Sequence, residues 1–137
     1  MSANPSKEVT HKGSCHCGAV QWECLAPTEI VAEVCNCTIC TKKHNIHFIV
    51  AKEKFTLIKG KDNLTEYTFN TGIAKHTFCK TCGVQGFYTP RSNPKCIGIN
   101  PGCIDSKTVV RLTFHHFNGQ EWEKTFAAEG APKVVSK

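Results

Sequence analysis

The stretch Cys35-Asn36-Cys37-Thr38-Ile39-Cys40, here called the trio, places three thiols within six residues. Two further clusters accompany it: an N-terminal doublet, Cys15-His16-Cys17, and a C-terminal doublet, Cys79-Lys80-Thr81-Cys82. Cys-x-Cys and Cys-x-x-Cys spacings let two thiolates reach one tetrahedral ion, which is usually zinc at ~2.3 Å from each sulfur. The clusters therefore predict two zinc sites that hold separate parts of the chain together.

Seven clustered sulfurs fill one four-coordinate site and leave a second site with three ligands. A closed site is structural, whereas an open coordination position accepts a substrate or a water molecule. Another protein side chain could close that position instead. The candidates for this are the isolated cysteines and several histidines, namely Cys24, Cys96, Cys103, His16, His44 and His47.

Spacing alone does not decide which clusters share an ion. The N-terminal doublet could join either the first two cysteines of the trio or the C-terminal doublet. The second pairing is favoured because all three trio cysteines are close enough in sequence to reach one ion. The two doublets would then form a four-thiol clip, which closes a long loop and lowers the entropy of the unfolded chain.

The composition describes one small domain that is rich in cysteine. The chain has 137 residues, of which 40% are hydrophobic and 20% are charged, so its composition is neither disordered nor membrane-spanning. Residues 1–13 lack the apolar stretch of a secretory signal, so we expect a cytoplasmic location, with the nucleus as the alternative. In either compartment, ten cysteines indicate metal binding or thiol chemistry rather than disulfides.

The charge pattern argues against a nucleic-acid partner. The formal net charge is +6, and seven thiolates with two Zn²⁺ ions would lower it to +3. Arg91 and Arg111 are the only arginines, although arginine is the preferred side chain for reading bases and phosphates. We therefore expect a small-molecule thiol or aldehyde as partner and no membrane association, and we predict no particular oligomeric state.

Short alternating segments separated by turn residues predict a mainly β domain over residues 12–130. Residues 1–11 and 131–137 are expected to form flexible tails. No twelve-residue window keeps a clear helical period, so helical turns are expected only near residues 38–43 or 101–105. The expected strands are residues 19–24, 46–51, 55–58, 64–69, 75–78, 84–88, 95–99 and 109–117.

Five segments together resemble one known family. They are Gly13-Ser14-Cys15-His16-Cys17-Gly18-Ala19-Val20, Cys35-Asn36-Cys37-Thr38-Ile39-Cys40, Leu64-Thr65-Glu66-Tyr67, His76-Thr77-Phe78-Cys79-Lys80-Thr81-Cys82-Gly83-Val84-Gln85 and Tyr88-Thr89-Pro90-Arg91-Ser92-Asn93-Pro94. Their order and spacing are similar to those of the glutathione-dependent formaldehyde-activating (Gfa) and centromere protein V family. The resemblance implies a β-tent fold of several small antiparallel sheets stapled by zinc.

The same resemblance implies a function and its metal ligands. Family members are described as carbon–sulfur lyases that join glutathione and formaldehyde as S-hydroxymethylglutathione, so glutathione is the expected co-substrate. The alternative is a zinc-scaffolded binding module of the centromere protein V type without catalysis. The resemblance implies a structural zinc on Cys15, Cys17, Cys79 and Cys82, and a second, substrate-accessible zinc on Cys35, Cys37 and Cys40.

Other side chains are candidates for contacts with the reactants. Arg91, Ser92 and Asn93 lie between two prolines, which restrict the loop, and they are candidate glutathione contacts. The candidate proton donors are His44, His47 and His76, because the reference pKa of histidine lies near neutrality.

Overall fold

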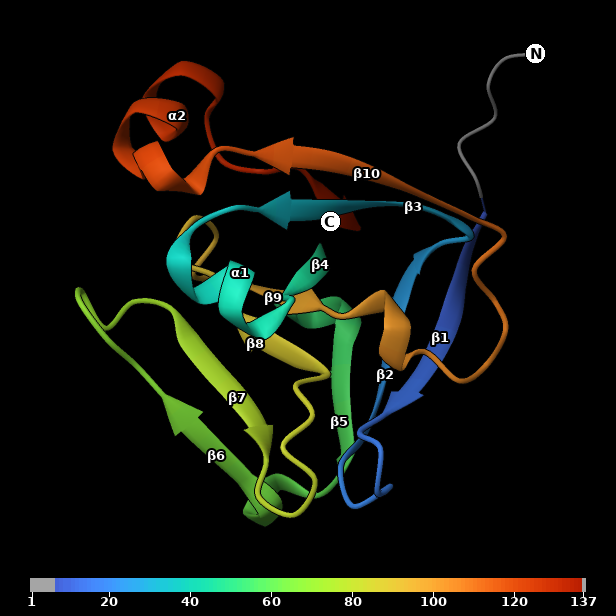
Figure 1. Ribbon diagram of the computed structural model, residues 1–137. Coiled ribbons are helices and arrows are strands. Elements are labelled where there is room, and N and C mark those ends of the chain that lie inside the picture. The colour runs from blue at the N-terminus through green and yellow to red at the C-terminus, as the bar shows by residue number, and fades with distance from the viewer. Residues whose placement is uncertain (1–6, 137) are drawn as a thin grey trace.

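The computed structural model describes residues 7–136, and it is built mainly from β-strands, as expected (Figure 1). The predicted helical turn at residues 38–43 is α1 (Thr38–Lys43), and a second helix, α2 (Trp122–Glu129), follows late in the chain. The strands are β1 (Glu8–Ser14), β2 (Gln21–Pro27), β3 (Glu29–Cys35), β4 (Ile46–Ala51), β5 (Phe55–Lys59), β6 (Leu64–Tyr67), β7 (Lys75–Cys79), β8 (Phe87–Thr89), β9 (Cys96–Ile99), β10 (Arg111–Phe117) and β11 (Val134–Ser136).

The strands form two sheets. The smaller sheet is antiparallel and has the order β1-β2-β5. The larger sheet has the order β10-β3-β4-β9-β8-β7-β6, and β11 also pairs with β4. Most of its neighbours are antiparallel, but β10 runs parallel to β3 and β11 runs parallel to β4. These parallel pairs depart from the expected small antiparallel sheets, because β10 and β11 return to the sheet only after long connections.

Trp22 on β2 lies at the centre of the core and is 1% exposed. A Cβ atom on Gly13 would overlap its indole ring, and one on Gly86 would lie 2.7 Å from its Nε1 atom. The ring centroid of Phe55 lies 6.1 Å from that of Trp22 and 4.7 Å from that of Phe87. These aromatic contacts join the smaller sheet to β8 of the larger one.

This arrangement places the cysteine clusters at different ends of the molecule. The β1–β2 and β7–β8 connections, which carry the two doublets, lie together at the lower end in Figure 1. Strand β3 runs to the opposite side and delivers the trio next to α1, with α2 beyond it. No helix in the described part of the chain is long and apolar enough to cross a membrane.

Both ends of the chain differ from the predicted tails. Residues 8–11 belong to β1, where His11 is fully buried and forms hydrogen bonds with Thr108 Oγ1 (2.5 Å) and the Pro27 carbonyl (2.9 Å). Residues 134–136 form β11 instead of a tail. The predictions for residues 1–6 and 137 lie outside the described residues. Strand β11 pairs with the distant strand β4, which a local pattern does not report, whereas β1 pairs with the next strand, β2.

Two interior elements are also absent from the sequence prediction. The first is strand β3, which lies inside the larger sheet and pairs with β10 on one side and with β4 on the other. Helix α2 is the other, and its eight residues are too few to show a period in a twelve-residue window. Its apolar contact is the stacked pair of Trp122 and Phe126, four residues apart.

Candidate metal centres and the adjoining pocket

The two doublets meet in one four-thiol cluster of Cys15, Cys17, Cys79 and Cys82. Their sulfur atoms all lie within 4.8 Å of one another, and Cys17 Sγ lies 3.6 Å from the sulfurs of both Cys15 and Cys79. All ten cysteines are free, so no disulfide accounts for this closeness. A tetrahedron with ~2.3 Å metal–sulfur bonds has sulfur–sulfur edges of about 3.8 Å. The cluster therefore fits one zinc ion with little rearrangement.

Hydrogen-bond donors point at the sulfurs of this cluster. The backbone N–H of Thr81 donates to Cys79 Sγ (3.3 Å), and the side-chain amide of Asn63 donates to the same sulfur (3.2 Å). The backbone N–H of Cys82 is the main cause that lowers the pKa of Cys79 to about 6, from its usual 9. Donors of this kind stabilise the thiolate, which is the form that binds a metal.

The trio forms a second, separate cluster. Cys35 ends β3, Cys37 lies at the N-cap position of α1, and Cys40 lies in the first turn of that helix. Their sulfurs lie within 4.8 Å of one another, and no fourth Cys, His, Asp or Glu of residues 7–136 joins them. The trio therefore offers a metal three protein ligands, whereas the four-thiol cluster offers a complete tetrahedral set.

Close packing fixes the sulfurs of the trio. The side-chain amide of Asn45 donates to Cys40 Sγ (3.8 Å). On the other side, a Cβ atom on Gly119 would overlap Cys35 Sγ and lie 2.7 Å from Cys37 Cβ. Hydrogen bonds from Cys35 and Cys40 hold the pKa of Cys37 well below its usual value, and the bond with Cys35 raises the pKa of Cys40. One thiolate is thus stabilised in the cluster before any metal binds.

A pocket of about 380 Å³ opens beside the trio, and all three cysteines contribute to its wall. Its volume lies in the range of small-molecule sites. The rest of the wall comes from β3, α1, β4, β7, β8 and the end of β10, from the loops after β6 and β8, and from residues between β10 and β11. The four-thiol cluster contributes no residue to this wall. Of the two clusters, the trio is the one that lines this pocket.

One wall of the pocket is a row of three rings. The rings of His76 and Tyr88 are stacked with centroids 5.0 Å apart, and the Tyr88 ring meets His47 edge-on at 4.9 Å. The Tyr88 hydroxyl and His47 Nε2 are hydrogen-bonded at 3.0 Å. Burial lowers the pKa of His47 to about 4 and also lowers the pKa of His76, so both imidazoles are neutral at pH 7. Two of the three candidate proton donors, His47 and His76, therefore line the pocket beside the trio.

A second wall contains the predicted loop of Arg91 and Ser92. The Arg91 guanidinium lies over the Trp122 ring, 3.8 Å from its centroid, and donates to Glu123 Oε1 (3.2 Å). All four of these residues line the pocket. The stack holds the guanidinium against a rigid surface. Arg91 is thus a fixed cation at the edge of the pocket.

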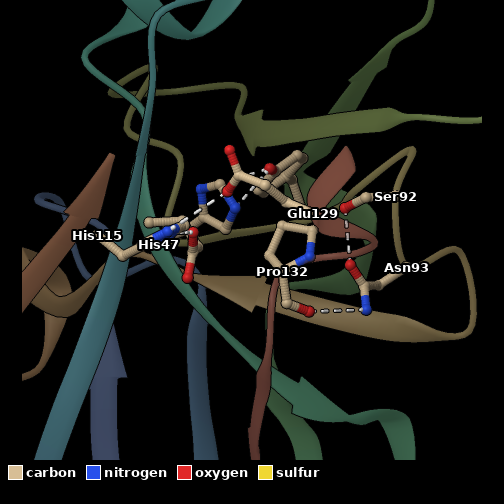
Figure 2. A network of polar contacts seen from close by, with 8 residues as sticks. His47, Ser92, Asn93, His115, Glu129 and Pro132 are labelled. Carbon is tan, nitrogen blue, oxygen red and sulfur yellow. Dashed lines mark hydrogen bonds and ion pairs between the residues drawn. The ribbon is translucent and has the colours of Figure 1, made fainter. Parts of the chain in front are cut away.

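Asn93 lies outside the pocket lining and contacts the C-terminal segment instead. Ser92 Oγ donates to Asn93 Oδ1 (2.7 Å), and the Asn93 amide donates to the Pro132 carbonyl (3.4 Å), as Figure 2 shows. Nearby, Glu129 of α2 lies 3.7 Å from His115 on β10. These contacts hold the segment that carries α2 against the pocket.

The remaining candidates lie away from the pocket. His44 is exposed and ends α1 in a left-handed conformation, with φ of 52°. His16 is exposed, Cys24 and Cys103 are buried in the core, and Cys96 is partly buried on β9. Sequence reasoning missed Tyr88, Trp122 and Glu123 as pocket residues, because only the folded chain brings them beside the trio.

Comparison with known proteins identifies the family. A family model described as glutathione-dependent formaldehyde-activating enzyme matches residues 10–120. The chain belongs to this family. A crystal structure of a Rhodobacter sphaeroides protein is also similar, with 32% sequence identity and a TM-score of 0.63 over 76% of this chain and 99% of that chain. The part that matches the glutathione-dependent formaldehyde-activating enzyme family includes both cysteine clusters, whereas α2 and β11 follow it.

Proposed function

We propose that this protein is a zinc-dependent enzyme of the carbon–sulfur lyase type, acting on S-hydroxymethylglutathione or a related adduct of a thiol and an aldehyde. The family description supports a glutathione-dependent, formaldehyde-activating role. The observation that carries the proposal is the trio, which has three thiols, no fourth protein ligand among residues 7–136, and a place in the pocket wall. An ion held there would keep one position for a substrate.

The donor sets favour zinc in both clusters. Thiolates are the soft ligands that zinc accepts in tetrahedral sites. In the proposal, Cys15, Cys17, Cys79 and Cys82 hold a structural ion, and Cys35, Cys37 and Cys40 hold the second. When bound at the trio, zinc supplies a Lewis acid that favours the thiolate form of a substrate thiol, which is the nucleophilic form.

The rest of the chain binds and orients the two reactants. Holding a thiol and an aldehyde together in one pocket turns a bimolecular encounter into a nearly unimolecular step. The neutral rings of His47, His76 and Tyr88 exclude water from one side of that pocket and provide its polar atoms. The reaction needs no oxidant, because it adds an S–H group across a C=O bond.

Arg91 and Ser92 are the proposed contacts to glutathione, which carries two carboxylates. Arginine has five N–H donors, and the structure occupies one nitrogen of Arg91 with Glu123. The guanidinium stacks on Trp122 through its face, and a guanidinium donates hydrogen bonds to a carboxylate along its edge. Asn93 acts indirectly in this scheme, by holding the loop to Pro132.

Native mass spectrometry with and without glutathione tests this proposal. The parent protein should carry two zinc ions and should bind glutathione. Cys37→Ser should stay folded and carry one zinc ion, whereas Cys96→Ser, which changes a cysteine outside both clusters, should keep two. Two ions in the Cys37→Ser protein would show that the trio is not the second site.

The same samples separate the enzyme from a zinc-scaffolded binding module. An enzyme should speed the interconversion of S-hydroxymethylglutathione with glutathione and formaldehyde above the uncatalysed rate. A protein with two zinc ions, no such activity and salt-dependent affinity for nucleic acid would instead be a binding module.

A further inference from the structure

Glu33 of β3 is a buried carboxylate that neither metal cluster uses. Its side chain is only 5% exposed, yet it lines the pocket beside the trio. His115 Nδ1 donates a hydrogen bond to Glu33 Oε1 (2.7 Å). The other oxygen, Oε2, has no hydrogen-bond or ion-pair partner among residues 7–136. Because a carboxylate accepts several hydrogen bonds, and because burying one is costly unless it is paired, Glu33 has capacity for a further partner.

His115 balances the charge of Glu33 only in part. Its side chain is 48% exposed, and its other ring nitrogen, Nε2, lies 3.7 Å from Glu129 Oε1 (Figure 2). The imidazole thus lies between two carboxylates, and even a protonated imidazole carries a single positive charge. A second cation beside Glu33 would therefore be stabilised by the carboxylate.

The geometry of β3 places Glu33 on the same side as the trio. Glu33 and Cys35 are alternate residues of this strand, so their side chains share one face of the sheet, about 7 Å apart along the strand. On the neighbouring strand β4, His47 pairs with Glu33 and also lines the pocket. A ligand whose sulfur lies at the trio can therefore reach Glu33 with a group a few bonds away.

The charged groups around the pocket carry more negative than positive charge. The lining residues with a full charge are Glu33, Glu123 and Arg91, and Arg91 forms an ion pair with Glu123. Three thiolates with one Zn²⁺ at the trio would add a net charge of −1. Within the described chain, Glu33 has no lysine or arginine as ion-pair partner. This pattern favours a positively charged group on the ligand.

We infer that Glu33 binds the ammonium group of the thiol substrate and thereby determines which thiols the pocket accepts. The inference rests on the proposed function, because it concerns the same pocket and the same substrate. Glutathione carries one ammonium group, on its γ-glutamyl residue, and a flexible chain joins that group to the thiol. Arg91 binds a carboxylate in this scheme, whereas Glu33 binds the ammonium group. Glu33 is a specificity-determining residue and takes no part in making or breaking the C–S bond.

Glutathione and its deamino analogue, glutaryl-cysteinylglycine, test the inference, because they differ only in the ammonium group. Isothermal titration calorimetry of the full-length, zinc-loaded protein measures both dissociation constants. The parent should bind glutathione about tenfold more tightly than the analogue, or better, as expected for a hydrogen bond between charged groups. In Glu33→Gln, whose side chain is neutral, the two compounds should bind within about threefold of each other.

Glu29→Gln is the matched control. It removes the same charge from the same strand, at an exposed position that does not line the pocket. This variant should keep the preference of the parent for glutathione. Both variants should carry two zinc ions, because neither residue belongs to a cysteine cluster. An unchanged preference in Glu33→Gln would overturn the inference, since another group would then bind the ammonium.

Activity and binding can fail separately. A parent that binds glutathione without accelerating its reaction with formaldehyde would contradict the proposed function, and the two dissociation constants would still decide the role of Glu33. An active parent that binds both compounds equally would contradict only the role of Glu33. A parent that is inactive and binds neither compound would contradict both.

Glu33→Asp replaces Glu33→Gln if the neutral variant does not fold. Aspartate keeps the negative charge that His115 contacts, but its carboxylate is withdrawn from the pocket by one methylene group. The preference for glutathione over the analogue should then fall at least about threefold, because the charged hydrogen bond is lengthened. A preference equal to that of the parent would overturn the inference.

Discussion

Gly119 packs against Cys35 so closely that any side chain at position 119 would overlap the cysteine sulfur. The two residues lie far apart in sequence: Cys35 ends β3, and Gly119 follows shortly after the end of β10, which runs parallel to β3. The register of that strand pair therefore sets the position of one ligand of the trio.

Gly119→Ala should release zinc from the trio and leave the four-thiol cluster occupied. The added methyl group must displace Cys35 or the Cys37 backbone, which lies 3.0 Å from the added atom. We expect the affinity for the second zinc ion to fall at least tenfold, measured by competition with a chromophoric chelator. Gly102→Ala is the control, since its nearest contact would be the Asn100 side chain at 3.2 Å. Equal affinities in both variants would contradict the packing described here.

Chelation should remove the two ions in separate steps. The trio supplies three protein ligands, whereas the four-thiol cluster supplies four and joins residues 62 positions apart. The first ion should therefore leave without unfolding, and loss of the second should unfold the β1–β2 and β7–β8 ends, because metal binding is coupled to folding. Zinc release and circular dichroism, recorded together, measure this order. Simultaneous release of both ions with loss of structure would contradict it.

Acid should destabilise the protein through His47. Its pKa is about 4 in the folded protein and 6.5 in the unfolded chain, so the unfolded chain binds the proton first as the pH falls. The contribution of neutral His47 to the free energy of unfolding is fully present above pH 6.5 and is lost progressively between pH 6.5 and pH 4. At pH 5 this loss amounts to about 2 kcal/mol in the free energy of unfolding.

His47→Gln, which stays neutral at every pH, supplies the comparison. Its free energy of unfolding should fall by about 2 kcal/mol less than that of the parent between pH 7 and pH 5. Urea titrations at the two pH values measure this difference. Parallel declines in the two proteins would mean that His47 does not remain neutral in the folded state.

Arg91→Lys should weaken glutathione binding although it keeps the positive charge. Lysine cannot form the planar stack on Trp122 or present two parallel N–H groups to a carboxylate. We expect KM for glutathione to rise about tenfold with kcat nearly unchanged, and KM for 2-mercaptoethanol, which has no carboxylate, to stay the same. A similar rise in KM for both thiols would show that Arg91 affects the shape of the pocket and does not bind a carboxylate.

The sequence predicted those features that depend on residues close together in the chain. Cysteine spacing defined the three clusters and favoured, without deciding, the pairing of the two doublets; the structure brings the two doublets into one cluster and keeps the trio apart. Alternation and turn residues located most of the strands, because a strand that faces the core on one side shows a two-residue period. The turn at residues 38–43 was also visible, since it begins directly after Cys37.

The remaining features depend on contacts between distant segments. The partner of β11 is the distant strand β4, so its three residues read as a tail; the prediction also missed the start of β1, which pairs with the next strand, β2. Tyr88 lies at the end of a predicted strand, and only the folded chain brings its ring against those of His47 and His76. Trp122 lies under Arg91 in the pocket wall, and only the folded chain brings these two side chains together.

The cysteines and part of the substrate-facing wall come from different stretches of the polypeptide. Trp122, Glu123 and Pro132 line the pocket, yet they follow residue 120, where the match to the family model ends. Substitutions after residue 120 can therefore change the pocket wall without replacing a cysteine of either cluster. Relatives with the same cysteine pattern but a different C-terminal sequence are expected to keep both cysteine clusters while differing in the shape of the pocket.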